Sequence, residues 1–126
     1  MMLETEVFKF EPGIVGISCA GRFTLGNRLS ETEALMNSLL SDGTRKLVLD
    51  LTHVEFVDSA GLGVIMRAFG EVEQLGGRLR ICGANEQVQR LFNITHTGTI
   101  LALDPDLVTS VRKLQDGGAE AAGQSS

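Results

Sequence analysis

Residues 46–75, KLVLDLTHVEFVDSAGLGVIMRAFGEVEQL, contain the change of periodicity that decides the fold. The opening KLVLDL is apolar on both faces except at Asp50, which is typical of a central strand covered on two sides. From Ser59 to Leu75 the apolar residues instead fall on one helical stripe, and Gly76-Gly77 provides a stop signal; the stripe consists of Leu62, Ile65, Met66, Phe69 and Val72. The segment therefore predicts a buried strand, a short connection and an amphipathic helix.

Upstream of this segment, the pattern predicts two strands and one helix. The strands are expected at Glu6–Phe10 and Ile14–Ala20, and Glu11-Pro12-Gly13 joins them as a tight turn. A helix is expected between Thr24 and Ser41. Its start has two candidates, because Ser30 and Glu33 can form a capping box while Thr24 is a competing cap.

Downstream, strands and helices continue to alternate. Strands are predicted at Arg78–Cys82 and Thr99–Leu103, and Asn85 is expected to cap a short helix between them. Asp104-Pro105 supplies a cap and a first-turn proline for a last helix, whose buried face is expected to carry Leu107, Val108, Val111 and Leu114. The order favours an α/β fold, with a mixed, mostly parallel sheet of about five strands packed by about four helices.

Length and charge limit the classes of function. The chain has 126 residues, which suits one domain; we expect that domain at 1–115 and a flexible tail at 116–126. The net charge is −5 and no basic cluster interrupts it, so neither nucleic acid nor a membrane surface is an expected partner. The N-terminal residues lack the layout of a signal peptide, and we expect a cytoplasmic protein.

The residues that catalysis requires are scarce. His53 and His96 occur outside any metal-binding or catalytic spacing, and the chain contains no phosphate-binding P-loop motif. Cys19 and Cys82 lie in strand-like runs, as expected of buried thiols. The carboxylates near the end of the central strand, namely Asp50, Glu55 and Asp58, are expected to be solvated. We therefore expect neither an enzyme nor a bound metal or cofactor.

Ser59 opens the predicted helix and has two interpretations. Serine is a favoured helix cap, so capping alone explains it. Asp58 can cap equally well, however, and the following Ala60-Gly61-Leu62-Gly63 leaves the helix start sterically open although glycine destabilises helices. These small residues favour a helix start that is accessible to another molecule.

Several motifs resemble one family. VEFVDSAGLGVIMRA, with the preceding KLVLDLTHV and the following LGGRLRICG, is similar to the core of the STAS domain family, specifically the bacterial anti-sigma factor antagonists. The resemblance extends from about Val7 to Leu114 and includes the Gly21-Arg22-Phe23 turn and the segment Gln89 to Phe92.

The resemblance implies a partner-switching protein. When unphosphorylated, it would bind an anti-sigma factor that is also a serine kinase and so free a sigma factor; phosphorylation at Ser59 would release it, and a serine phosphatase would reset it. Thr24 stands where many family members carry an acidic residue on the partner-binding face. The domain is expected to be a monomer or weak dimer. The partner-binding residues implied are Gly21, Arg22, Thr24, Asp58, Ser59, Ala60, Gly61, Leu62 and Gly63.

Two other functions stay open at this point. The first is a scaffold or sensor component of a larger signalling assembly, because fold alone does not determine function. The second is a nucleotide-binding module, since a helix N-terminus attracts anions. After the start of the predicted helix, no basic residue follows until Arg67, which weakens the nucleotide hypothesis.

Overall fold

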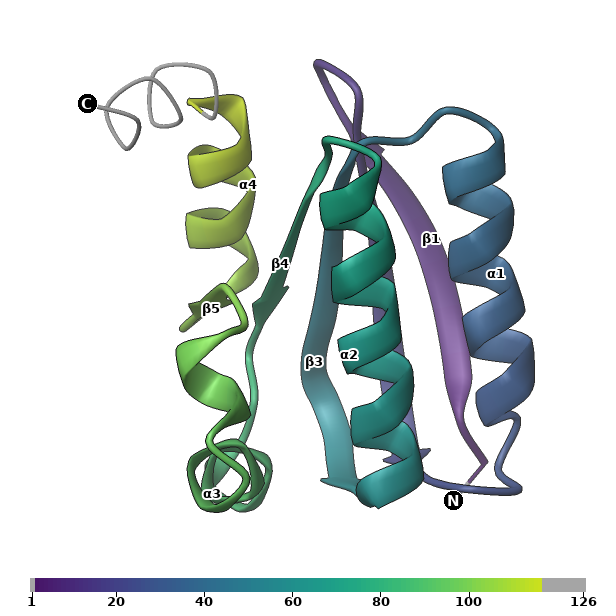
Figure 1. The fold of residues 1–126 in the computed structure, drawn as a ribbon, viewed down its shortest axis with the longest axis vertical. Coiled ribbons are helices and arrows are strands. Elements are labelled where there is room, and N and C mark those ends of the chain that lie inside the picture. Colours follow the sequence, from purple (N-terminus) through teal and green to yellow (C-terminus); the bar gives the residue numbers. More distant parts are fainter. Residues whose placement is uncertain (1, 117–126) are drawn as a thin grey trace.

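A five-stranded sheet in the order β1-β2-β3-β4-β5 forms the centre of the computed structural model, which describes residues 2–116 (Figure 1). The antiparallel pair β1–β2 lies at one edge, and every other pairing is parallel. The predicted mixed, mostly parallel sheet is therefore confirmed. The strands are β1 (Glu4–Phe10), β2 (Ile14–Phe23), β3 (Lys46–Val57), β4 (Arg78–Cys82) and β5 (Leu103–Asp104).

Helices cover both faces of the sheet. Each face of the sheet has its own hydrophobic core, one larger than the other. Because strand side chains alternate between faces, Leu47, Leu49 and Leu51 of β3 point into the larger core, and Val48 points into the smaller one. The larger core is closed by α1, α2 and α3, whereas α4 closes the smaller core with Val111 and Leu114. The helices are α1 (Leu29–Ser41), α2 (Ser59–Gln74), α3 (Glu86–Ile94) and α4 (Leu107–Gln115), with a 3₁₀ turn, η1, at Thr97–Thr99.

The central strand is longer than its apolar run predicts. Beyond Leu51 it continues to pair with β2, up to the partners Arg22↔Phe56 and Phe23↔Val57, with two register irregularities on the way. Exposed residues are tolerated in this extension because the backbone pairing persists. His53, which falls in the short connection expected after KLVLDL, therefore lies in the strand. As a result, β2 and β3 end side by side, and α1 and α2 start at that same end of the molecule (Figure 1).

Neither predicted cap starts α1. The helix begins after Arg28, which adopts a left-handed conformation at φ 62° and makes no side-chain cap. Thr24 begins a turn, in which the carbonyl oxygen of Thr24 accepts the Asn27 N–H over 3.1 Å. The residues between Thr24 and Leu29 therefore form a structured loop, which periodicity alone assigned to the helix.

The C-terminal elements also differ from the prediction. The last strand is only Leu103–Asp104, because Thr97–Thr99 turns as a 3₁₀ helix and Leu101 enters the core. The last helix is capped by Asp106, whose carboxylate accepts the Thr109 N–H over 2.8 Å, and not by Asp104. Val108 points away from the sheet and is 64% exposed, so its predicted burial was wrong.

The ends of the predicted domain stay a prediction. The proposed limits were 1–115 for the folded part and 116–126 for a flexible tail. Residues 117–126 lie outside the described residues, as does residue 1.

A buried carboxylate joins α4 to the sheet. Asp104, expected as a cap, has a fully buried side chain that accepts two hydrogen bonds from Arg80, at 2.6 and 3.1 Å. Lys113 and Ser110 of α4 donate to the same carboxylate over 2.8 and 2.6 Å. Burial opposes ionisation of Asp104, but the hydrogen bonds from Arg80, Lys113 and Ser110 outweigh it and lower the pKa to about 2. The ionised carboxylate therefore stabilises the attachment of α4.

Asp104→Asn should lower the free energy of unfolding at pH 7 by about 2–4 kcal/mol, because Arg80 loses its buried counter-charge. Since the folded pKa lies below the ordinary 3.8, this stabilisation is present above pH 3.8 and is lost as the pH falls through about 2. Urea unfolding of both proteins between pH 7 and pH 2 measures the difference. Asp106→Asn is the matched control and should change stability by only a few tenths of a kcal/mol. An Asp104→Asn deficit that is independent of pH would contradict this assignment.

Candidate functional site

Asp58 organises the start of α2. Its backbone is extended, and one carboxylate oxygen accepts the Gly61 N–H over 2.8 Å as the helix cap. The other oxygen accepts the Leu25 N–H over 3.0 Å and so joins the helix start to the loop after β2. Ser59 is the first residue of the helix and is exposed. Because Asp58 performs the capping, the Ser59 hydroxyl is not needed for it.

Gly61 allows the two connections to approach each other. A Cβ atom at this position would overlap the carbonyl oxygen of Phe23, at the end of β2. The same carbonyl oxygen accepts the Asp58 N–H over 3.4 Å. Only glycine therefore lets the first turn of α2 lie against the end of β2 at this point.

An open groove of about 510 Å³ lies beside Ser59, between the starts of α1 and α2. A bidentate ion pair joins its walls: Arg67 of α2 donates to Glu33 of α1 over 2.8 and 3.2 Å. This pairing lowers the pKa of Glu33 and raises that of Arg67. Arg28 also lines the groove and lies 3.3 Å from the Glu31 carboxylate. Two arginines thus line the groove beside Ser59, although the Glu31 that pairs with Arg28 lines a neighbouring hollow.

The residues predicted for partner binding divide into two groups. The side chain of Leu62 lies in the core, Gly61 is buried, and Gly21 is buried against the backbone of Met2 at φ 107°. These three residues shape the site but offer no side chain to a partner. The residues with at least partial exposure are Arg22, Thr24, Asp58, Ser59, Ala60 and Gly63.

Sequence reasoning missed the loop between β2 and α1. Leu25 is 78% exposed, although its backbone is tied to Asp58. The loop is further ordered by Asn27, whose side chain donates to the carbonyl oxygen of Arg22 over 2.7 Å. The signal was Gly26, which adopts φ 80° and interrupts the helix that the apolar spacing predicted from Thr24.

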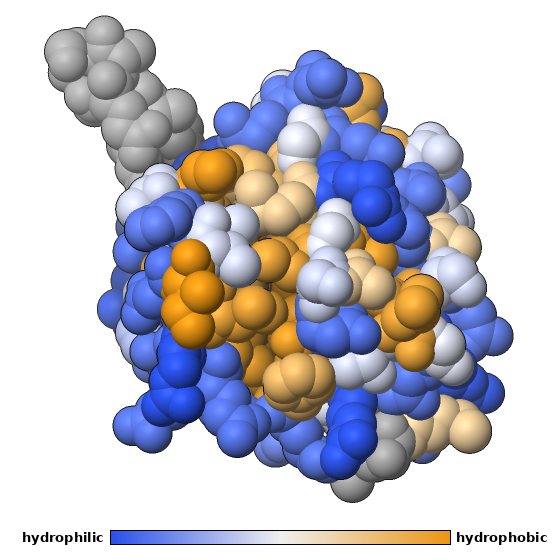
Figure 2. All heavy atoms as spheres, turned by 60° about the horizontal axis from the view of Figure 1, so that its bottom comes forward, coloured by the Kyte–Doolittle hydropathy of each residue, from blue (hydrophilic) through white to orange (hydrophobic). Residues whose placement is uncertain are grey.

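Apolar side chains gather at this end of the molecule. Figure 2, in which the lower end of Figure 1 is turned forward, shows them grouped in the middle of the face with polar residues around them. Three exposed apolar residues belong to elements that meet at this end: Leu25, Phe56 at the end of β3, and Ile94 at the end of α3. Exposed apolar surface with a polar rim is typical of protein-binding sites.

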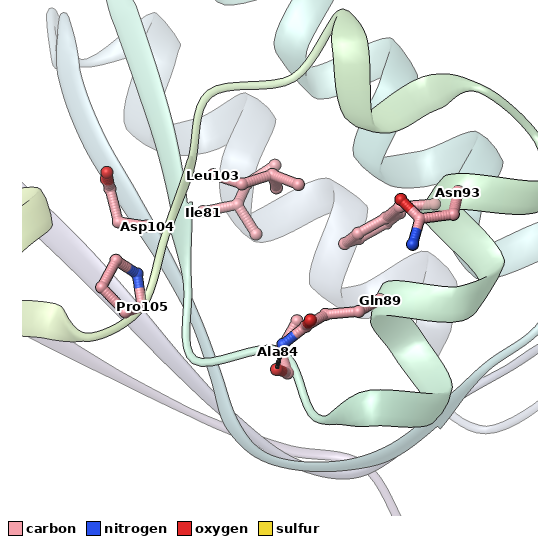
Figure 3. A pocket seen from close by; sticks show the side chains of 8 residues that line it. Ile81, Ala84, Gln89, Asn93, Leu103, Asp104 and Pro105 are labelled. Carbon is pink, nitrogen blue, oxygen red and sulfur yellow. Dashed lines mark hydrogen bonds between the residues drawn. The ribbon is translucent and has the colours of Figure 1, made fainter.

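A second hollow, of about 310 Å³, lies between α3 and the β4–β5 edge. Gln89 and Asn93 extend from the helix on one side, and Ile81 and Leu103 lie on the other (Figure 3). The one carboxylate that lines it, Asp104, is already bound by Arg80 and Lys113. The hollow therefore offers amide groups and apolar surface, without a free charge for catalysis.

The titratable groups elsewhere fit structural roles. Burial, reinforced by the negative charge of Asp50, raises the pKa of both Cys19 and Cys82 to about 12, as expected of buried thiols. Asp50 itself is buried, contrary to expectation, and accepts hydrogen bonds from the backbone and side chain of Thr52. Within residues 2–116, no cluster of three or more His, Cys, Asp or Glu side chains could hold a metal ion. No helix in that range is both long and apolar enough to span a bilayer.

Comparison with known proteins agrees with this architecture. Residues 7–110 match the sequence model of the STAS domain. The chain belongs to the STAS domain family. The anti-sigma F factor antagonist of Paenibacillus polymyxa is 32% identical to this STAS domain over 69 residues, which are 55% of this chain and 59% of the relative. The chain thus spans about three fifths of that relative's length.

Solved structures show the same fold at low identity. An anti-sigma factor antagonist from Mycobacterium paratuberculosis superposes with a TM-score of 0.82 at 20% identity, covering 90% of this chain and 95% of the other. The Bacillus cell fate determinant SpoIIAA in its phosphorylated form has a TM-score of 0.68 at 15% identity, covering 86% and 98%. The names of these STAS relatives describe regulators, in agreement with the prediction that the chain is not an enzyme.

Gly61→Ala should reduce the free energy of unfolding by about 2–3 kcal/mol, because the added methyl group overlaps the Phe23 carbonyl oxygen. Gly63→Ala is the matched control on the same helix, where the nearest atom is Arg67 Nη1 at 3.4 Å. That substitution should leave stability unchanged or raise it by up to about 1 kcal/mol. Thermal and urea unfolding measure both; equal effects would show that the close approach at Gly61 is unimportant.

Proposed function

We propose that this STAS domain is an anti-sigma factor antagonist controlled by phosphorylation of Ser59. The observation that carries the proposal is the exposed Ser59 hydroxyl, which begins α2 beside an open groove although Asp58 already caps the helix. In the unmodified state the domain binds an anti-sigma factor that is also a serine kinase, and the sigma factor is freed. The names of its relatives support this role.

The modification is a phosphoryl transfer from ATP bound to the kinase. The Ser59 oxygen attacks the γ-phosphorus, the bond to the β,γ-bridging oxygen breaks, ADP leaves, and the hydroxyl proton passes to a base of the kinase. A serine phosphatase reverses the modification by hydrolysis. That SpoIIAA, which shares the fold, has a phosphorylated form is consistent with this proposal.

The phosphate is expected to abolish binding while the fold persists. It adds about −1.5 to −2 charges at an exposed helix start, where the helix dipole partly stabilises it and Asp58 partly opposes it. At a docked interface, the same charge meets a partner surface that was complementary to a neutral hydroxyl. An unpaired charge in such a position costs several kcal/mol, and each 1.4 kcal/mol is about tenfold in affinity.

A protein partner fits the surface better than a nucleotide does. The side chains of Leu25 and Phe56 are 78% and 47% exposed at this end of the molecule. The two arginines that line the groove, in contrast, are already paired with Glu31 and Glu33, so the groove offers little net positive charge to a free anion.

Ser59→Ala should bind the anti-sigma kinase as tightly as the unmodified protein and should not be released when ATP is added. Ser59→Asp should bind at least about tenfold more weakly, because it places a negative charge at the interface. Calorimetric titration with and without ATP, with mass mapping of the modified residue, measures both effects. Equal affinities for the two variants, or a phosphate mapped to another residue, would refute the proposal.

Leu25→Ser should weaken binding to the same partner by about tenfold, since it removes an exposed apolar side chain from a loop that is ordered before binding. Val108→Ser is the matched control, because Val108 is 64% exposed on α4, which packs on the opposite face of the sheet. The control should leave the affinity unchanged. Comparable losses for both variants would mean that the partner does not dock at the loop after β2.

A further inference from the structure

We propose that, when Ser59 carries a phosphate, Arg67 leaves Glu33 and binds that phosphate together with Arg28. The phosphoserine then lies in the groove of its own domain instead of extending into solvent. This inference rests on the proposed modification of Ser59, and it adds an intramolecular arginine clamp as the means by which the modified state is held.

Arg67 lies within reach of Ser59 because of Gly63. Residues four positions apart share one helix face, with about 5–6 Å between their Cβ positions, so Ser59 and Gly63 are neighbours along the groove. The Arg67 guanidinium is folded back along the helix, with Nη1 at 3.4 Å from the position of a Gly63 Cβ. Because Gly63 has no side chain, nothing at that position separates the guanidinium from a phosphate on Ser59.

Arg28 approaches from the opposite wall. It closes the loop before α1 in a left-handed conformation and lines the same groove as Ser59. Its guanidinium contacts Glu31, which lines a neighbouring hollow, so the side chain must turn to reach a phosphate on Ser59. The Arg28–Glu31 pair is solvent-exposed, with the two side chains 51% and 70% exposed, and such pairs contribute little stability. The Arg67 side chain is 60% exposed and that of Glu33 is 29% exposed, and their contact is bidentate, so the phosphate must compete with a stronger pair there.

A covalently attached phosphate competes well with Glu33. The phosphate carries up to two negative charges, whereas the Glu33 carboxylate carries one. Its three oxygens accept hydrogen bonds from the planar guanidinium at least as well as a carboxylate does. The phosphate is also tethered to the same helix, about two turns before Arg67, so it pays none of the association cost that a free anion pays. Two carboxylates oppose the phosphate: Asp58, whose oxygens already accept the backbone N–H groups of Leu25 and Gly61, and Glu33, which lines the same groove and gives up Arg67 in the exchange.

The exchange would alter the shape of the site as well as its charge. The Arg67–Glu33 pair is an interaction between α2 and α1 across the groove, and it is lost when Arg67 turns to the phosphate. The phosphoserine and the two guanidinium groups then fill space that is open in the unmodified protein. A partner that inserts a side chain into the groove is excluded in addition to being repelled.

The test uses full-length protein with phosphoserine incorporated at position 59 during translation, which requires no kinase. The second pKa of the phosphate, about 6 in a free phosphoserine, is measured by ³¹P NMR titration at low salt. Arg67→Gln and Arg28→Gln should each raise this pKa, by about half a unit or more, because each removes a neighbouring positive charge. Arg67→Lys should raise the phosphate pKa less than Arg67→Gln does, since lysine keeps the positive charge but loses the bidentate hydrogen bonding.

Arg112→Gln is the matched control, because Arg112 is an exposed arginine in the last turn of α4, which packs on the opposite face of the sheet. It should leave the phosphate pKa unchanged. A second readout is the carboxyl pKa of Glu33, which Arg67 lowers in the unmodified protein. Incorporation of phosphoserine should raise it when Arg67 is present and raise it much less in Arg67→Gln.

A phosphate pKa that neither arginine substitution changes would overturn the clamp. So would a Glu33 pKa that phosphorylation raises equally with and without Arg67. Because the phosphate is introduced without a kinase, these outcomes do not depend on whether an anti-sigma kinase modifies Ser59. Failure of the kinase to modify or bind the protein would instead refute the proposed function alone.

Discussion

The carboxylate of Asp58 is the interaction on which the site depends. Its two oxygens accept N–H groups from Gly61, in the first turn of α2, and from Leu25, in the loop after β2. These residues are far apart in sequence, and the parallel pairing of β2 with β3 brings their connections together. One side chain thus determines where the helix begins, orders the loop that presents Leu25, and leaves the neighbouring serine hydroxyl free for another use.

The site and the structural scaffold are physically separate, which a reversible modification requires. Asp104, Arg80 and Lys113 attach α4 to the face of the sheet opposite α1 and α2. Ser59, in contrast, is exposed at the end of the molecule where β2 and β3 finish. A charge added there changes solvated groups at the surface and leaves the buried network intact, so binding can be lost without loss of folding.

The sequence predicts those features of the fold that depend on neighbouring residues. The apolar run of β3 and the stripe of α2 follow from periodicity, and the capping ability of Asp58 follows from its chemistry. The role of Asp104 and the two-residue length of β5 depend instead on which distant side chains meet, and periodicity holds no such information. The ion pair across the groove is not predicted, for the same reason: Glu33 and Arg67 are 34 positions apart and meet only when two helices pack.

Thr24 suggests how partner choice is distributed over this surface. The STAS proteins that this chain resembles often carry an acidic residue at this position, next to Leu25 and near the Asp58 carboxylate. Replacing that charge with a half-buried threonine removes one negative charge from the edge of the site and weakens the attraction of a basic partner over long distances.

The exposed Leu25 is held in place before binding, so little conformational freedom is lost when a partner covers it. We therefore expect recognition here to depend more on apolar contact at Leu25 and Phe56 than on charge. A surface of that kind is also sensitive to a phosphate at Ser59, because apolar contact offers a new charge no compensating partner.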